Sequence, residues 1–77
     1  MEELLRFLIN ELVEDKQSVK IVTETDGDKI NFKVNVAEND MGKIIGRQGK
    51  VSKAIRTVIK AAAKDNKIYN VEICDEI

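Results

Sequence analysis

Glycines and cations are concentrated in one short stretch of this 77-residue chain, GKIIGRQGKV at residues 42–51. The stretch holds three of the four glycines of the sequence. Glycine has no Cβ, so it lets a ligand approach the backbone closely, and it adopts positive φ angles at little cost. Cations such as Arg47 and Lys50 attract anions, and the N-terminus of a following helix adds unpaired N–H groups and a partial positive charge. These residue types therefore predict a phosphate-binding site at residues 46–50.

The glycine spacing excludes two common nucleotide-binding motifs. A P-loop needs G-x-x-x-x-G-K-[ST] after a strand, and a dinucleotide-binding loop needs G-x-G-x-x-G inside a βαβ unit. Gly42, Gly46 and Gly49 have other intervals, and the segment before them is predicted to be helical. An ATPase and a dinucleotide-dependent enzyme are both excluded. Gly42 itself is expected to serve close packing within the short helix.

The formal net charge of −1 conceals an uneven distribution. Residues 1–42 carry a net charge of −5, residues 43–67 carry +7, and the remaining tail carries −3. A basic segment on an acidic chain is the electrostatic footprint of a nucleic-acid partner, and this one begins at the glycine cluster. Within the segment, Lys60, Lys64 and Lys67 are interpreted as a solvated helix face. Arg56 is expected either to lie near phosphate or to pair with an acid.

Composition gives no support for catalysis or for a metal site. The chain has no histidine, and Cys74 is its only cysteine, so neither a disulfide nor a multi-ligand zinc site is expected. Ser18 and Ser52 have no evident base partner. We predict no enzyme activity, no cofactor and no small-molecule substrate. The acidic N-terminus is unlike a signal peptide, and no apolar run approaches the roughly 18 residues of a membrane span, so a cytoplasmic protein is predicted.

Hydrophobic periodicity predicts the elements that position the glycine segment. Apolar residues at helical spacing predict helices over 1–14 and 50–64, with a very short helix between them that begins at Asn39 or Asp40 as N-cap and ends at Gly46. Strands are predicted in SVKIVTE, KINFKVNV and IYNVEIC, the first two joined by an Asp26-Gly27 turn as an antiparallel hairpin. The order α-β-β-α-α-β predicts one α+β domain over residues 1–77, a three-stranded sheet packed on three helices.

The same periodicity predicts which side chains are buried. On the long helix four are expected in the core: Ala54, Ile55, Val58 and Ile59. On the last strand three are expected to share one face: Tyr69, Val71 and Ile73. Phe7 and Phe32 are expected to face the core, which leaves no aromatic platform for stacking bases. Asn66 is expected in a left-handed conformation after the long helix.

The segment IIGRQGKVSKAIR resembles the signature of the KH domain, an apolar pair followed by G-x-x-G and a basic helix with apolar residues at fixed offsets. A helix and a hairpin before the motif, with one strand after it, is the type II order of that fold. The longer segment DMGKIIGRQGKVSKAIR resembles the KhpA family of small stand-alone bacterial RNA-binding proteins. The resemblance covers essentially the whole chain. KH modules clamp about four nucleotides of single-stranded nucleic acid, with the GXXG loop on the backbone.

The resemblance implies a role for the residues around the loop at 46–49. The two glycines let the RNA backbone approach, the pair between them meets phosphate and sugar, and of the apolar pair before them one lines a base groove and the other anchors the core. The expected RNA-binding residues are Lys43, Ile44, Ile45, Gly46, Arg47, Gln48, Gly49, Lys50 and Lys53. Ser52 departs from the apolar residue that many KH domains have at this position, and Val51 is expected to fill that space.

Two functions follow from the resemblance. The first is binding of single-stranded RNA through the GXXG loop and an aliphatic groove, in a post-transcriptional regulator or RNA chaperone. The alternative is a protein-interaction module in which RNA binding is secondary, because the resemblance implies a homodimer or a heterodimer with a larger KH-containing partner. Pairing raises the avidity of a domain that binds weakly through one groove. Apolar residues left over on the first or the long helix are the expected seam.

Overall fold

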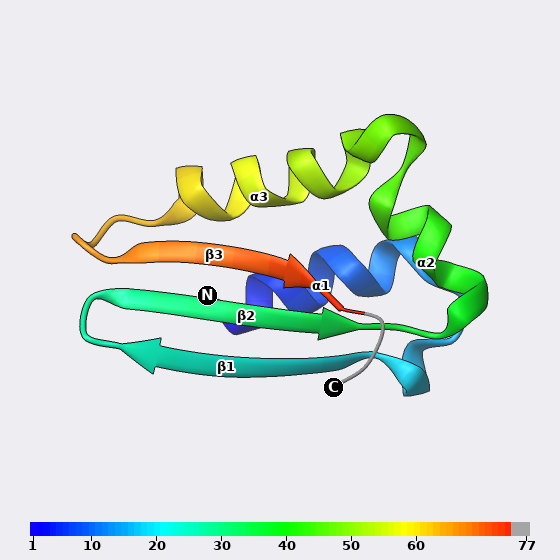
Figure 1. Cartoon of the computed structure of the whole chain (residues 1–77), viewed down its shortest axis with the longest axis horizontal. Coiled ribbons are helices and arrows are strands. Elements are labelled where there is room, and N and C mark those ends of the chain that lie inside the picture. Colours follow the sequence, from blue (N-terminus) through cyan, green and yellow to red (C-terminus); the bar gives the residue numbers. More distant parts are fainter. Residues whose placement is uncertain (75–77) are drawn as a thin grey trace.

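The structure is a computed structural model that describes residues 1–74, so the last three residues of the predicted domain lie outside it. Three helices lie over a three-stranded sheet (Figure 1). The elements are α1 (Glu2–Leu12), β1 (Lys20–Asp26), β2 (Lys29–Asn35), α2 (Glu38–Ile45), α3 (Lys50–Ala62) and β3 (Ile68–Ile73), with short 3-10 turns η1 (Lys16–Ser18) and η2 (Arg47–Gly49). The predicted α-β-β-α-α-β order of an α+β domain is confirmed.

The sheet has the order β1-β2-β3 and is mixed. β1 and β2 form the predicted antiparallel hairpin, with Lys20 opposite Asn35 and Gly27 at φ +60° in the turn. β2 and β3 are parallel, with Lys29 opposite Ile68. Parallel neighbours need a crossover connection, and here α2, η2 and α3 supply it. The glycine segment therefore lies within the crossover, at the end of the domain where α2 turns into α3.

The core lies between the sheet and the helices. Leu5 and Ile9 of α1, Ile44 of α2 and Ile59 of α3 are completely buried, and Phe32 of β2 is 2% exposed. The alternation predicted for the strands is confirmed, because the residues on the covered face are buried or half-buried: Ile30, Phe32, Val34, Tyr69, Val71 and Ile73. The other face of the sheet carries polar residues and is open to solvent. One apolar layer thus fixes the position of all three helices.

Three core predictions are wrong. Phe7 of α1 is 60% exposed, Val58 of α3 is 42% exposed, and Ala54 is also exposed, whereas Ile55 and Ile59 are buried as expected. Successive helix positions differ by about 100° around the axis, and only an arc around Ile55 and Ile59 meets the sheet. The apolar arc of α3 is wider than the surface that the sheet covers, so its outer part remains exposed beside α1.

Two helix ends also differ from prediction. α2 begins at Glu38, one or two residues before the expected N-cap, and α3 ends at Ala62, whose successor Ala63 is extended. Asn66 does not adopt the predicted left-handed conformation, since Gln48 is the only residue other than glycine with a positive φ in residues 1–74. The turn forms differently because Asp65 accepts hydrogen bonds from the N–H of Lys67 and the hydroxyl of Tyr69. Within residues 1–74, no helix has both the length and the hydropathy needed to cross a membrane.

Candidate nucleic-acid interface

The predicted GXXG segment forms a tight 3-10 turn between α2 and α3. Gly46 ends α2 with φ +76° and donates its N–H to the carbonyl of Gly42 at 2.9 Å. Gln48 and Gly49 are left-handed, with φ +58° and +75°, and α3 begins at the next residue. Three of these four residues have a positive φ, which side-chain-bearing residues rarely adopt. The backbone here is shaped by glycine, as the sequence predicts.

The two glycines of the loop have different environments. A Cβ placed on Gly46 would clash with Cγ2 of Val51 and lie 2.8 Å from its backbone nitrogen, whereas one on Gly49 would meet only the hydroxyl of Ser52 at 3.8 Å. Gly46 is therefore required for close packing of the loop on the first turn of α3. The prediction that Gly42 serves close packing is wrong, because a Cβ there would meet no atom within 4 Å.

The side chains of the loop are available to a ligand. Arg47, Gln48, Lys50 and Lys53 are all exposed. No side chain caps the N-terminus of α3, although the N–H of its first residue, Lys50, donates to the carbonyl of Arg47. The start of a helix carries a partial positive charge. Two cations and a helix N-terminus therefore act on the same volume of solvent, an arrangement that attracts phosphate.

The apolar pair before the loop is divided between core and surface. Ile44 is completely buried and Ile45 is 38% exposed. Neighbouring positions on a helix point about 100° apart, so a pair at the end of α2 can present one side chain to each environment. Ile44 anchors the loop end of α2, and Ile45 offers apolar surface next to Gly46. The resemblance implies that one residue of this pair anchors the core, and Ile44 is the buried one.

Ser52 and Arg56 connect the loop to the edge of β3. The hydroxyl of Ser52 is buried and donates to the carbonyl of Gly49 at 3.0 Å. Nη1 of Arg56 donates to the Ser52 hydroxyl at 3.4 Å, and its Nε donates to the carbonyl of Val71 at 3.0 Å. Ser52 therefore replaces the expected apolar residue with a local hydrogen bond, while Val51 packs beneath Gly46. Arg56 makes no ion pair within residues 1–74, so the expected alternative of an acid partner is not found there.

Asp40 locks α2 to the segment that follows α1. Its carboxylate is 1% exposed and accepts the backbone N–H groups of Glu14 and Asp15 at 3.1 and 3.0 Å. These two hydrogen bonds, together with the ammonium of Lys43, hold the pKa of Asp40 below its ordinary value despite the burial. The predicted N-cap role is wrong, because the Asp40 side chain serves a different helix end. Its own N–H donates to the carbonyl of Ala37.

Lys43 is held by acids of the protein itself. Its ammonium lies 2.7 Å from a carboxylate oxygen of Glu14 and 3.5 Å from one of Asp40. The hydrogen bond that Lys43 donates to Glu14 and the negative charges of both acids raise the pKa of Lys43. A phosphate would have to compete with Glu14 for this cation. Ile44 is completely buried, and among the predicted RNA-binding cations Lys43 is the one that the structure engages with other side chains.

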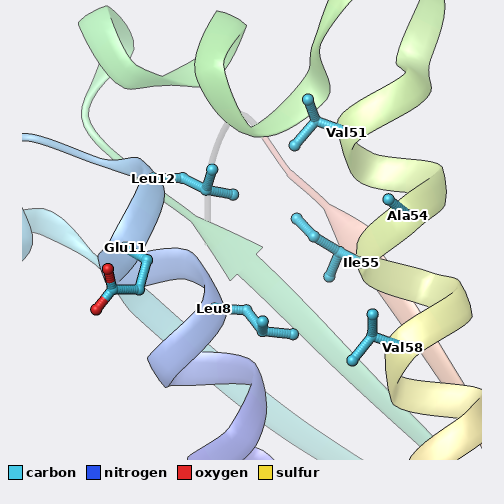
Figure 2. A pocket seen from close by; sticks show the side chains of 7 residues that line it. All are labelled: Leu8, Glu11, Leu12, Val51, Ala54, Ile55 and Val58. Atoms are coloured by element: carbon cyan, nitrogen blue, oxygen red, sulfur yellow. The ribbon is translucent and has the colours of Figure 1, made fainter.

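An apolar groove separates α1 from the outer part of α3. It has a volume of about 250 Å³ and is lined by Leu8, Glu11, Leu12, Val51, Ala54, Ile55 and Val58. Figure 2 shows the apolar side chains of both helices pointing into this groove, with Glu11 of α1 at its border. The exposed Ala54 and Val58, wrongly assigned to the core, belong here. Sequence periodicity shows that α3 has more apolar positions than one sheet can cover. This excess of apolar positions is the sequence signal for an exposed apolar groove.

The described residues offer nothing that would hold a metal. In residues 1–74 there is no group of three or more His, Cys, Asp or Glu side chains arranged to bind a metal ion. Asp40, the one buried carboxylate among them, is engaged by two N–H groups and Lys43. The chemistry of the site is therefore that of hydrogen-bond donors and cations around a glycine-shaped backbone.

Comparisons with known proteins agree with this geometry. The family model of the KhpA/KhpB KH domain matches residues 2–73. Among curated proteins, the chain is 47% identical over 74 residues to the RNA-binding protein KhpA of Clostridium acetobutylicum, which covers 95% of this chain and 99% of that protein. It is 37% identical over 76 residues to the RNA-binding protein KhpA of Listeria monocytogenes, with 97% and 100% covered. No significant match was found among solved structures.

A family model that covers nearly the whole chain and relatives of almost equal length identify the fold without ambiguity. The GXXG turn between α2 and α3 and the parallel pairing of β2 with β3 are the local features that carry the resemblance. The chain belongs to the KhpA/KhpB family of KH-domain proteins.

Proposed function

We propose that this protein binds single-stranded RNA through the clamp formed by residues 46–50. The observation that carries the proposal is the backbone of the clamp, where Gly46, Gln48 and Gly49 hold positive φ angles directly before the N-terminus of α3. A sugar-phosphate chain can approach this backbone closely because Gly46 and Gly49 carry no Cβ. The curated relatives are named RNA-binding proteins, which supports RNA as the ligand.

The clamp gives each predicted residue a distinct part. Arg47 and Lys50 attract phosphate, Lys53 adds charge one turn later, and Ile45 supplies an aliphatic surface for a base. Arg56 adds hydrogen-bond donors on the side of the helix toward β3, because three of its five N–H groups remain after its hydrogen bonds to Ser52 and Val71. Without an aromatic platform at the clamp, bases gain little from stacking. The protein then binds a single strand modestly and with loose sequence preference.

The proposed cellular role depends on RNA binding and not on catalysis. A small domain that holds RNA without a catalytic group acts as a post-transcriptional regulator or an RNA chaperone, and we place it in the cytoplasm. No enzyme activity belongs to this proposal. Residues 1–74 carry neither a metal-ligand cluster nor a helix suited to the membrane, which is compatible with such a role.

The salt dependence of RNA binding tests the proposal. A clamp that contacts three or four phosphates of a tetranucleotide releases a matching number of counterions, so the slope of log K against log salt concentration should be about −2 to −3. Fluorescence anisotropy of a labelled tetranucleotide, titrated at several salt concentrations, measures this slope. A slope near zero would show that the basic segment does not dock the RNA backbone.

A second function is favoured by the apolar groove between α1 and α3. We propose that it forms a seam with a second copy of the chain or with a larger KH-containing partner. Val58 and Leu12, both at least 36% exposed, present apolar surface there. Glu11 of α1 is the one charged residue in the lining of the groove, so the surface offered to a partner is mainly apolar. The groove does not include the clamp residues 46–50, so pairing leaves the clamp open.

Sedimentation of a surface variant tests this seam. Val58→Lys is expected to keep the protein monomeric at concentrations where the unmodified chain dimerises, because a charge would be buried in an apolar contact. Val22→Lys is the matched control, since Val22 is 37% exposed on the open face of the sheet. Dimerisation should persist in that control. Equal sedimentation of the Val58 variant and the unmodified chain would remove the groove as the seam.

A further inference from the structure

A row of cations continues from the clamp along one flank of α3. Lys53, Arg56 and Lys60 stand at spacings of three, four and seven residues, which places them on one side of the helix. This is the side toward β3, because Nε of Arg56 bonds the carbonyl of Val71. The apolar groove lies on the other side of the same helix. α3 therefore separates a cationic flank from an apolar one, with its buried face between them.

The cations of this flank are not neutralised by the protein. The ion pairs found within residues 1–74 involve only Lys33 and Lys43. Asp65, the one acid between residues 43 and 67, is bonded to the N–H of Lys67 and the hydroxyl of Tyr69. Apart from Lys43, the cations of residues 43–67 are thus available to a polyanion along α3.

A hollow lies at the far end of this flank, away from the clamp. It has a volume of about 300 Å³ and is lined by Lys60, Ala63, Lys67, Ile68 and Tyr69. Ile68 at the start of β3 is 52% exposed. An exposed aliphatic side chain between two lysines suits a nucleotide, with the base or sugar against Ile68 and the phosphates near the ammonium groups. We call this site the far hollow.

The far hollow lies beyond the reach of a short stacked strand held in the clamp. α3 has 13 residues, so it is about 20 Å long, and the far hollow begins near its C-terminal end. Four nucleotides span three phosphate intervals, which is about 10 Å in a stacked strand. The nine phosphate intervals of a ten-nucleotide RNA span about 30 Å even in a stacked strand, so an RNA of this length can lie in the clamp and reach Lys67 together.

We propose that an RNA strand leaving the clamp continues along Lys53, Arg56 and Lys60 and places a further nucleotide in the far hollow. The inference rests on the proposed RNA binding and extends its footprint beyond the clamp. RNA is the polyanion that fits, because the flank is continuous with the clamp and the far hollow combines cations with an aliphatic surface. An acidic protein segment would use the lysines but not the clamp backbone.

Binding of a short and a long RNA to a charge variant tests the footprint. Lys60→Gln/Lys67→Gln should bind a tetranucleotide as the unmodified chain does and should bind a ten-nucleotide RNA about tenfold more weakly at low salt. Loss of two phosphate contacts should also make the salt slope for the long RNA shallower by about 1.4. The matched control is Lys16→Gln/Lys20→Gln, which removes two exposed cations beside the start of β1 and should change neither affinity.

The outcomes separate this inference from the proposed function. Equal affinities of the variant and the unmodified chain for the long RNA would overturn the far hollow and leave the clamp intact. Equal weakening by the control pair would also overturn it, since the effect would then be one of total charge. Displacement of the long RNA by a deca-glutamate peptide at equal concentration would assign the flank to an acidic protein instead. Failure of the unmodified chain to bind either RNA would overturn the proposed function itself.

Discussion

Alanine in place of Gly46 is expected to destabilise this domain strongly. Gly46 combines φ +76° with ψ 171°, a region that is open to glycine and costs other residues about 1 to 3 kcal/mol. The added Cβ would also lie 2.8 Å from the backbone nitrogen of Val51, which cannot move without shifting the start of α3. Overpacking of this kind costs about 1 to 3 kcal/mol more. A chain of 77 residues has a free energy of unfolding of about 4 to 12 kcal/mol, so a loss near 4 kcal/mol is large.

Gly49→Ala provides the matched comparison for Gly46→Ala. Gly49 also has a positive φ, but its site has room for a Cβ, so only the left-handed strain of about 1 to 2 kcal/mol applies. Thermal unfolding followed by circular dichroism should show a much larger fall in Tm for the Gly46 variant, by about 4 to 8 °C for each kcal/mol. Equal falls in Tm for the two variants would mean that contact with Val51 does not constrain the loop.

The difference between these glycines illustrates what the sequence can and cannot predict. The spacing G-x-x-G and the cations around it predict a phosphate-binding turn, and residues 46–49 do form a turn with three positive φ angles. Periodicity predicts the element order for the same reason, because local spacing determines which face of a helix or strand is apolar. Which glycine is crowded depends on how Val51 packs beneath the loop, a tertiary contact that no spacing encodes.

Asp40 and Val58 are two further residues whose environment depends on tertiary contacts that residue spacing does not predict. Asp40 satisfies N–H groups about 25 residues earlier in the chain, so its local position near a helix start pointed to the wrong role. Val58 has the spacing of a core residue but lies where α1 and α3 leave a groove open. Hydrophobic spacing shows that a side chain is apolar on one face of a helix. How much of that face neighbouring elements cover depends on tertiary packing, which the spacing does not predict.

The clamp and the apolar groove lie at different places on α3, and this separation bears on the two proposed functions. The clamp occupies the N-terminal end of the helix, and the groove is formed along the side toward α1. Figure 2 shows Val51 at the upper end of the groove, where the helix leaves the loop. Val51 is shared by both, since it also packs against Gly46. Pairing through the groove is thus compatible with RNA binding and would bring two clamps into one assembly, which raises avidity.

Replacing both residues between the glycines with aspartate, Arg47→Asp/Gln48→Asp, is expected to abolish RNA binding while the domain stays folded. Both side chains are exposed, and aspartate tolerates the left-handed conformation that Gln48 adopts. The change replaces one positive charge with two negative charges at the point where phosphate must approach. Juxtaposed like charges cost several kcal/mol, and about 3 kcal/mol corresponds to a loss of affinity of more than a hundredfold.

A charge-matched variant on the far side of the domain separates a local effect from a general one. Lys20→Glu/Asn70→Asp makes the same change in net charge on the open face of the sheet, where both residues are exposed. Anisotropy titrations with one single-stranded RNA should show binding for this control and none for the clamp variant, with circular dichroism spectra unchanged for both. Loss of binding in both variants would mean that RNA binding depends on the net charge of the protein and not on the position of the clamp. Retained binding in the clamp variant would mean that RNA docks elsewhere, because a backbone-recognition site cannot hold phosphate against two facing carboxylates.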